Sequence, residues 1–262
     1  MSSSPTLVDT TRSEWLKFRT VRASLIGVLT FLVLTVGLAV LVSFIIKANW
    51  NHRDPARQLV FDPVATSLVG VFFGQFAAGV MGARVITSEY ASGAIRTTLA
   101  AVPRRVHLAL AKAIVLLVTF AVLGEVASFA AFEIGQLIYK SGHLPTGSLS
   151  NSTDLRAVVF AGVYLTLLTL VGYGLGLLLR TTATTISVFV SILFIVPIIV
   201  NFLPSNWQDH ITKFLPSQLG TSMMSPDLTS QAFSWGVSAL LLTLYTVVIV
   251  AAGTVMLVRR DA

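Results

Sequence analysis

Six long apolar runs dominate this chain and leave little freedom in what it can fold into. Each run is close to the roughly 20 residues that a helix needs to cross a bilayer at about 1.5 Å per residue. Within a bilayer only helices and closed barrels satisfy their own backbone hydrogen bonds, and runs of this length are typical of helices. We therefore predict an all-α polytopic membrane protein with spans at residues 25–46, 64–86, 108–138, 157–179, 184–203 and 233–258.

Charged residues are scarce and unevenly placed along the chain. They make up 11% of it, against about 25% in a typical soluble domain, which excludes most soluble enzymes. Twelve of the 18 Lys and Arg residues lie before span one, around the loop after span two, after span four and at the C-terminus, Lys112 among them. By the positive-inside rule these segments and both termini are cytoplasmic. The net charge of +7 is therefore interpreted as a topology signal, and no nucleic-acid partner is expected.

The N-terminal segment divides into two parts. Residues 1–11 are polar and are expected to be disordered, whereas residues 12–24 carry aromatic and basic side chains at helical spacing. A helix of this kind lies naturally in the membrane interface among lipid headgroups. The alternative is a solvated extension of span one. The residues assigned to this interfacial helix are Trp15, Lys17, Phe18, Arg19 and Arg22.

Small residues recur every fourth position in span two and again in span four. Such ridges let two helix backbones approach closely, so helix packing is a better explanation for them than a ligand site. The residues concerned are Gly70, Gly74, Ala78 and Gly82 in span two, and Gly172 and Gly176 in span four.

The loop after span two, residues 87–105, is the most informative segment. Ser88 is expected to cap a short helix, with Glu89 at the positive end of its dipole, and Pro103 ends that helix. A hairpin does not need such a helix merely to join two spans. It is either a docking surface for a partner or a topology anchor with Arg104 and Arg105 at lipid headgroups, and the residues alone leave both open.

Span three carries two acidic residues, Glu125 and Glu133. Carboxylates within a membrane are costly and usually face a cavity or a partner. Gln136 lies about 20° from Glu125 around a helix, which predicts a polar strip along the outer half of the span. The strip either lines a translocation path or holds a proton, with Phe129 and Phe132 as further path candidates. Alternatively, one carboxylate pairs with a neighbouring helix or a loop arginine, and Glu133 reaches the outer surface.

The segment before span six, residues 204–231, is unusually apolar for an outer loop. Its aromatic and aliphatic residues predict short helices that dip back toward the outer leaflet, which is possible where the bundle buries their backbone. These residues are Trp207, Phe214, Leu215, Leu219, Met223 and Met224.

Motifs for enzyme chemistry are absent from the sequence. There is no phosphate loop for ATP hydrolysis and no H-E-x-x-H pair, and the four His residues lack the spacing of metal ligands. With no Cys, thiolate chemistry is excluded as well. We expect a non-catalytic membrane subunit that binds no metal or cofactor of its own.

Three segments resemble the type-2 ABC transporter permeases of bacteria, actinobacterial members most of all. They are residues 14–22 (EWLKFRTVR), 86–105 (ITSEYASGAIRTTLAAVPRR) and 172–180 (GYGLGLLLR). The resemblance implies the six-helix type V exporter fold, an interfacial connecting helix, a coupling helix after span two and re-entrant helices before span six. The coupling helix would contact the ATP-binding subunit through Glu89, Tyr90, Gly93, Ile95, Arg96 and Thr97, with Arg104 and Arg105 beside them.

The resemblance also implies an assembly and a role. Two ATP-binding subunits would bind ATP and Mg²⁺, a second permease copy would complete the translocation path, and a homodimer is favoured over a heterodimer. The expected location is the bacterial cytoplasmic membrane, and the expected activity is export of a drug, a peptide antibiotic or another amphipathic cargo. Two alternatives stay open, an ion-coupled secondary transporter and a membrane sensor or assembly protein with the same fold.

Overall fold

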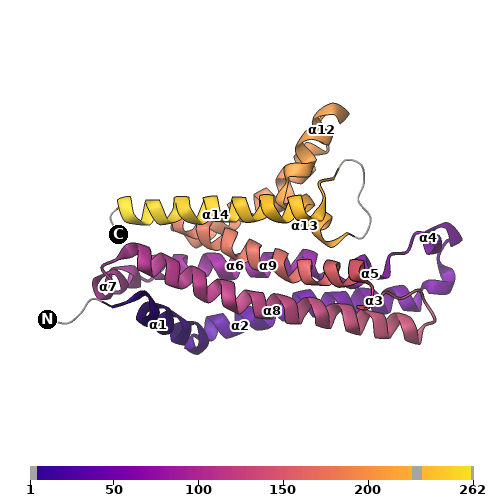
Figure 1. The fold of residues 1–262 in the computed structure, drawn as a ribbon, viewed down its shortest axis with the longest axis horizontal. Coiled ribbons are helices and arrows are strands. Elements are labelled where there is room, and N and C mark those ends of the chain that lie inside the picture. Colours follow the sequence, from indigo (N-terminus) through magenta and orange to yellow (C-terminus); the bar gives the residue numbers. More distant parts are fainter. Residues whose placement is uncertain (1–4, 226–231, 261–262) are drawn as a thin grey trace.

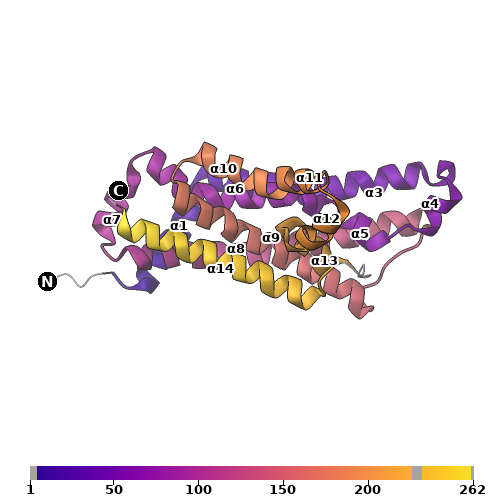
Figure 2. The same cartoon turned by 90° about the horizontal axis from the view of Figure 1, so that it is seen from above.

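Six long helical segments run side by side along the length of the molecule, as Figures 1 and 2 show from two directions. The computed structural model describes residues 5–225 and 232–260, and these contain helices and no strands. Six of the helical segments are long and apolar enough to cross a membrane, which confirms the predicted fold class. They are residues 22–48, Gly70–Ala91 (α6), Arg105–Ser141 (α8), Ser152–Leu179 (α9), residues 182–200 and Trp235–Arg259 (α14).

The core of the bundle is α9, which is the most deeply buried span. It packs against α6, α8 and α14, while span one packs against α6 and α8. Span one consists of Arg22–Leu32 (α2), the π-helical Val33–Gly37 (η1) and Leu38–Ala48 (α3). Span five has a similar π-helical insert and consists of Thr182–Val190 (α10), Ser191–Ile195 (η3) and Val196–Val200 (α11). The peripheral spans expose Leu, Val, Ile and Phe side chains outward, as a lipid-facing surface requires.

The N-terminal helix begins earlier than predicted. It is α1, Leu7–Thr20, and Thr6 and Asp9 form a capping box at its start. The predicted disorder of residues 1–11 is therefore wrong from Leu7 onward, and residues 1–4 lie outside the described residues. Val21 has an extended backbone and separates α1 from α2, so residues 12–24 are not one continuous helix. The break lets α1 leave the direction of the bundle (Figure 1).

The second span is also shifted from its predicted bounds. Residues 64–67 belong to a separate short helix, Pro63–Ser67 (α5), which Asp62 caps by accepting bonds from the backbone N–H groups of Val64 and Ala65. The span itself is α6, and it continues to Ala91, five residues beyond the predicted end. Between α3 and α5 lie the short helices Trp50–His52 (η2) and Pro55–Leu59 (α4) at the outer end.

Short helices fill the outer segment before span six: Ser205–Ile211 (α12), Thr212–Phe214 (η4) and Pro216–Met224 (α13). α13 packs against α9 and α14 and buries Leu219 and Met223. In contrast, α12 projects from the bundle (Figure 1), and Trp207 is 62% exposed. The predicted short helices are therefore present, but the bundle buries α13 and not α12, and residues 226–231 lie outside the described residues.

Candidate functional site

The loop after span two forms a separate short helix, Ala94–Ala101 (α7). Gly93 precedes it with a positive φ of 73°, a left-handed conformation that glycine adopts without steric cost. Pro103 follows α7, and α8 starts at Arg105. α7 therefore joins α6 to α8 at the end of the molecule that also holds α1 and the C-terminal end of α14 (Figures 1 and 2).

One side of α7 is held by the bundle and the other is open. Ile95 is buried in the main hydrophobic core and anchors the helix. Gly93, Arg96, Thr97 and Arg104 are exposed. Four of the eight predicted partner-contact residues are therefore available on the surface.

Glu89 is not on that surface, contrary to the expected position. It belongs to the last turns of α6, is 7% exposed and points into the protein. The predicted capping role of Ser88 is also wrong, because its hydroxyl donates to the carbonyl oxygen of Arg84 within α6. The cause is the same for both residues: α6 runs on to Ala91, and the chain turns only at Gly93.

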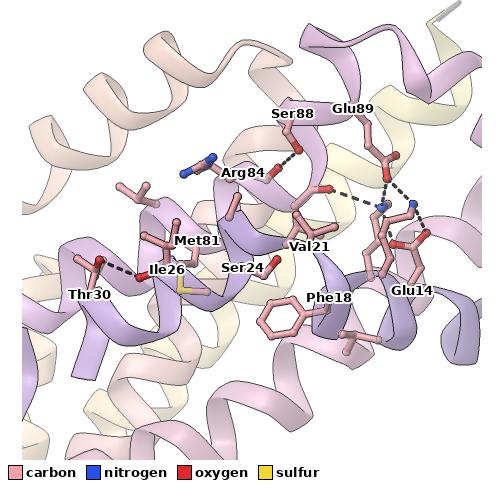
Figure 3. A pocket seen from close by; sticks show the side chains of 18 residues that line it. Glu14, Phe18, Val21, Ser24, Ile26, Thr30, Met81, Arg84, Ser88 and Glu89 are labelled. Carbon is pink, nitrogen blue, oxygen red and sulfur yellow. Dashed lines mark hydrogen bonds and ion pairs between the residues drawn. The ribbon is translucent and has the colours of Figure 1, made fainter. Parts of the chain in front are cut away.

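Four charged side chains from three helices meet at the end of the bundle that holds α7, and we call them the ion-pair cluster: Glu14 and Lys17 of α1, Glu89 of α6 and Lys112 of α8. Lys112 Nζ lies 2.7 Å from Glu14 Oε2 and 2.7 Å from Glu89 Oε1. Lys17 Nζ lies 2.9 Å from Glu14 Oε1 and 2.7 Å from Glu89 Oε1. Figure 3 shows the carboxylates of Glu14 and Glu89 converging at this point. Residues 14, 89 and 112 are thus tied together although they are far apart in sequence.

Burial makes the ion pairs of this cluster necessary for the stability of the fold. The side chain of Lys112 is only 1% exposed, so its charge depends on the two carboxylates for compensation. Lys112 was counted in the sequence only as one of the basic residues of the cytoplasmic side, and its burial was not anticipated. A lysine four residues into an apolar run is itself a sequence signal for an acidic partner, because unpaired charges inside a membrane protein are rare.

The electrostatics of the two α1 residues favour their charged forms. Burial opposes ionisation of Glu14, but the charges and hydrogen bonds of Lys112 and Lys17 outweigh it and hold the pKa of this carboxyl below its ordinary value. Burial likewise acts to lower the pKa of Lys17, and hydrogen bonds to Glu89 and Glu14 raise it above the ordinary value on balance. At neutral pH α1 is therefore joined to α6 and α8 by ionised groups.

Two further contact candidates, Tyr90 and Arg105, are engaged within the chain. Arg105 Nη1 donates to the carbonyl oxygens of Leu257 and Arg260 at 2.9 and 2.8 Å, at the C-terminal end of α14. The guanidinium of Arg180 lies 5.1 Å from the ring centroid of Tyr90. These contacts hold the end of α14 and the end of α9 against the α6–α8 hairpin.

The five residues assigned to the interfacial helix separate into two sets. Trp15, Arg19 and Arg22 are exposed, and the Arg19 guanidinium lies 5.9 Å from the Trp15 ring centroid. Phe18 packs against the main core, and Lys17 turns toward the ion-pair cluster. Glu14, which the sequence did not single out as a site residue, is buried on the same inward face.

The polar strip predicted on span three does not exist as one surface. Glu133 is exposed, whereas Gln136 is buried and makes three hydrogen bonds, two as donor to Pro63 O and Ser67 Oγ and one as acceptor from Gly147 N. Phe132 is buried in the core, and Phe129 is partly buried against it. Gln136 thus fastens the outer loops to α8.

Glu125 lies on the same span, and unlike Gln136 it has a polar atom without a partner in residues 5–225 and 232–260. Its carboxyl packs beside Gly162 of α9, and its buried Oε2 has no hydrogen-bond partner among the described residues. No lysine or arginine in the described part of the chain forms an ion pair with it.

The small-residue ridges lie in helix–helix seams. A Cβ atom at Gly70 or Gly74 would meet Thr35 of span one, and one at Gly82 would meet the backbone carbonyl of Thr169 in α9. Gly172 faces Gly79 across the same α6–α9 seam, Gly176 faces Ala83 and Ile86, and Ala78 is fully buried. These residues set how closely α6 can approach its neighbours.

Comparison with known proteins assigns the chain to a family. A family model described as "ABC-2 family transporter protein" matches residues 10–208, which include most of α1, α7 and the first five spans. No curated protein matches the chain significantly. The chain therefore belongs to the ABC-2 family of transporter proteins, which confirms the resemblance found in its sequence.

Proposed function

We propose that this protein is the membrane-spanning permease subunit of an ATP-driven ABC exporter and that α7 is its coupling helix. The observation that carries the proposal is the position of α7. It is a short helix at the tip of the α6–α8 hairpin, and Arg96 and Thr97 are exposed on it. The excess of Lys and Arg in the segments at this end supports a cytoplasmic location.

The ion-pair cluster supports a lever mechanism for coupling. ATP-driven closure of the partner subunits moves α7, and α6 and α8 move with it because both are continuous with its flanking turns. Lys112 ties α1 to both helices through Glu14 and Glu89. The interfacial helix and the hairpin therefore move as one rigid body. Rigid-body motion of this kind can switch a packed bundle between two states.

The rest of the proposed assembly follows the family resemblance. Two ATP-binding subunits bind ATP and Mg²⁺, a second permease copy completes the path, and a homodimer is favoured. The complex resides in the bacterial cytoplasmic membrane and exports a drug, a peptide antibiotic or another amphipathic cargo. The chain itself contributes no catalytic residue to ATP hydrolysis.

Copurification tests the docking role of α7. Tagged protein from native membranes is expected to retain a soluble subunit that carries a phosphate loop. Arg96→Glu should reduce that association and the cargo-stimulated ATPase rate together, since it reverses a charge on the exposed side of α7. Arg259→Glu is the matched control, because Arg259 is exposed at the end of α14. Undiminished association and transport in Arg96→Glu, in a chain that folds normally, would exclude α7 as the docking element.

Glu125 favours one other function, an ion-coupled secondary transporter. A membrane carboxyl without a partner for Oε2 is the kind of group that such carriers use to hold a proton. Glu125→Gln distinguishes the two functions in reconstituted vesicles. The exporter requires ATP and keeps transporting when an ionophore collapses the proton gradient. The secondary transporter stops under the ionophore and loses its coupling in Glu125→Gln.

A further inference from the structure

A cavity of about 300 Å³ opens between α1, α2, α6 and α8, next to the ion-pair cluster. Its polar end contains the cluster, and its other end is lined by apolar residues of α2 and α6, Ile26 and Met81 among them (Figure 3). Gly27 lines the cavity between them, and even a Cβ atom there would meet the Met81 side chain at 3.0 Å. The absence of a side chain at Gly27 thus lets Met81 pack closely between the two spans at this end of the cavity.

The depth of the cavity matches the boundary between lipid headgroups and acyl chains. Thr30 lines it eight residues after the start of α2, about 12 Å along that helix. Arg84 lines it seven residues before the end of α6, about 10 Å from that end. The cavity therefore begins at the cytoplasmic interface and extends into the apolar layer.

The charge of the cavity comes from Arg84. The ion-pair cluster contains two acidic and two basic groups and is neutral as a whole. Arg84 is exposed at the cavity and makes no ion pair with any residue of 5–225 or 232–260. The hydroxyls of Ser24 and Ser88 lie in the same lining. The Ser88 hydroxyl already donates to Arg84 O, so the cavity presents one uncompensated positive charge and the Ser24 hydroxyl above an apolar wall.

We propose that this cavity binds an anionic phospholipid of the inner leaflet. Arg84 pairs with the phosphate, the Ser24 hydroxyl donates a hydrogen bond to it, and one acyl chain lies along the apolar wall that Ile26, Ala77 and Val80 form. Basic pockets between spans on the cytoplasmic side are suited to anionic lipid headgroups. A soluble anion would leave the apolar wall uncovered, and a neutral lipid would leave Arg84 without a counter-charge.

Native mass spectrometry of the purified protein, released from nanodiscs, tests the headgroup contact. With phosphatidylglycerol and phosphatidylcholine as probes, we expect one tightly retained phosphatidylglycerol. Arg84→Ala should weaken its retention about fivefold, the effect expected for one basic residue at an anionic membrane surface. Arg84→Lys should largely restore it. Arg259→Ala removes the same charge from the same end of the molecule, outside the cavity, and should have no effect.

A second pair of variants tests the acyl-chain contact. Ala77→Leu fills the apolar part of the cavity and should abolish retention of the lipid. Ala251→Leu adds the same volume on an exposed face of α14 and should leave retention unchanged. Comparable thermal unfolding of the two variants shows that lost retention is not lost folding.

Four results would overturn the proposal. They are equal retention of the two lipids by the wild type, undiminished retention in both Arg84→Ala and Ala77→Leu, an equal loss in Arg259→Ala, and displacement of the lipid by millimolar glycerol 3-phosphate. The last result would identify the cavity as a site for a soluble phosphate.

Discussion

The two ends of this bundle are held together by different chemistry. At the end that holds α7, which the charge pattern predicts to be cytoplasmic, Lys112 and Lys17 bridge Glu14 and Glu89. At the outer end the described residues form no ion pair. There Gln136 bonds to Pro63, Ser67 and Gly147, and Tyr139 bonds to Ser43 and packs edge-on against Phe61 at a centroid distance of 5.4 Å.

The difference teaches how each end can respond to force and to pH. The cytoplasmic contacts join three helices through charges that fail together when one is removed, which suits a set of helices that moves as a unit. The outer contacts are mostly neutral and fail one at a time, which suits fixed loops. The charged groups that take part there bond to neutral ones: Asp154 Oδ2 accepts from Ser148 N, and Lys47 Nζ donates to Ser141 Oγ at 2.8 Å.

The largest expected effect is that of removing the central charge of the cluster. Lys112→Met leaves the buried carboxylates of Glu14 and Glu89 with only the half-exposed Lys17 to compensate them, and we expect it to lower the free energy of unfolding by about 3–5 kcal/mol. Chemical unfolding in detergent micelles measures the change. Lys140→Met on the same helix is the control, since Lys140 is exposed at the outer end and its loss should cost little.

A compensated variant sharpens this experiment. Glu14→Gln and Glu89→Gln added to Lys112→Met remove the uncompensated charges and should recover much of the lost stability, because neutral replacement of a whole buried ion pair is often tolerated. If the triple variant is less stable than Lys112→Met alone, the cost is one of packing and the electrostatic account of the cluster is wrong.

The next largest effect is that of acid, which should loosen the ion-pair cluster and leave the outer end unchanged. The pKa of Glu14 is lowered in the folded state, so its contribution is full above the unfolded value of about 4.3 and is lost as pH falls through the lower folded value. The pKa of Lys17 is raised, so its contribution is full below about 10.4 and is lost as pH rises through the folded value. α1 should therefore stay attached between about pH 4.3 and 10.4 and loosen on either side.

Spin labels measure the loosening of α1 directly, because the chain has no native cysteine that would also take up a label. Labels at Ser13→Cys in α1 and Thr97→Cys in α7 should give a broader distance distribution below about pH 4. Labels at Phe44→Cys in α3 and Leu137→Cys in α8 report on the outer end and should not change over that range. Equal broadening of both pairs would mean that acid unfolds the bundle as a whole.

The sequence predicted the fold well because a bilayer constrains it strongly. Six apolar runs of sufficient length specify six helices almost regardless of their neighbours. The helix ends were less accurate because local signals decide them. Gly93 is a typical residue just after a helix end, and it indicates that α6 continues past residue 86, although the loop was expected to begin there.

The site was predicted only in part, because the direction of a side chain depends on which helices surround it. Arg96 and Thr97 are exposed on α7 as expected, whereas Glu89 and Lys112 face inward. The sequence around each of these two residues does not show which way the side chain points. Each becomes interpretable only when Glu14 of α1 is placed beside them, and that contact spans 98 positions from Glu14 to Lys112.

At the outer end, the loss of Gln136 should have an intermediate effect. Gln136→Leu removes two donated bonds and leaves the buried N–H of Gly147 without its acceptor, which should cost about 1–3 kcal/mol. The cost should be the same at pH 5 and pH 8, since no charge is involved. Glu133→Gln, an exposed change one turn away, should cost much less. A strongly pH-dependent cost for Gln136→Leu would contradict the neutral character of this end.

The smallest effect should come from Tyr139, also at the outer end. Tyr139→Phe keeps the ring against Phe61 and removes only the 2.9 Å hydrogen bond between its hydroxyl and Ser43 Oγ. Ser43 still donates to Ala39 O within its own helix at 2.8 Å, so no buried group on α3 is left without a partner. The net loss should be about 1 kcal/mol, several times smaller than that of Lys112→Met. A loss as large as that of Lys112→Met would mean that the outer end also fails as a unit, and the contrast between the two ends would not hold.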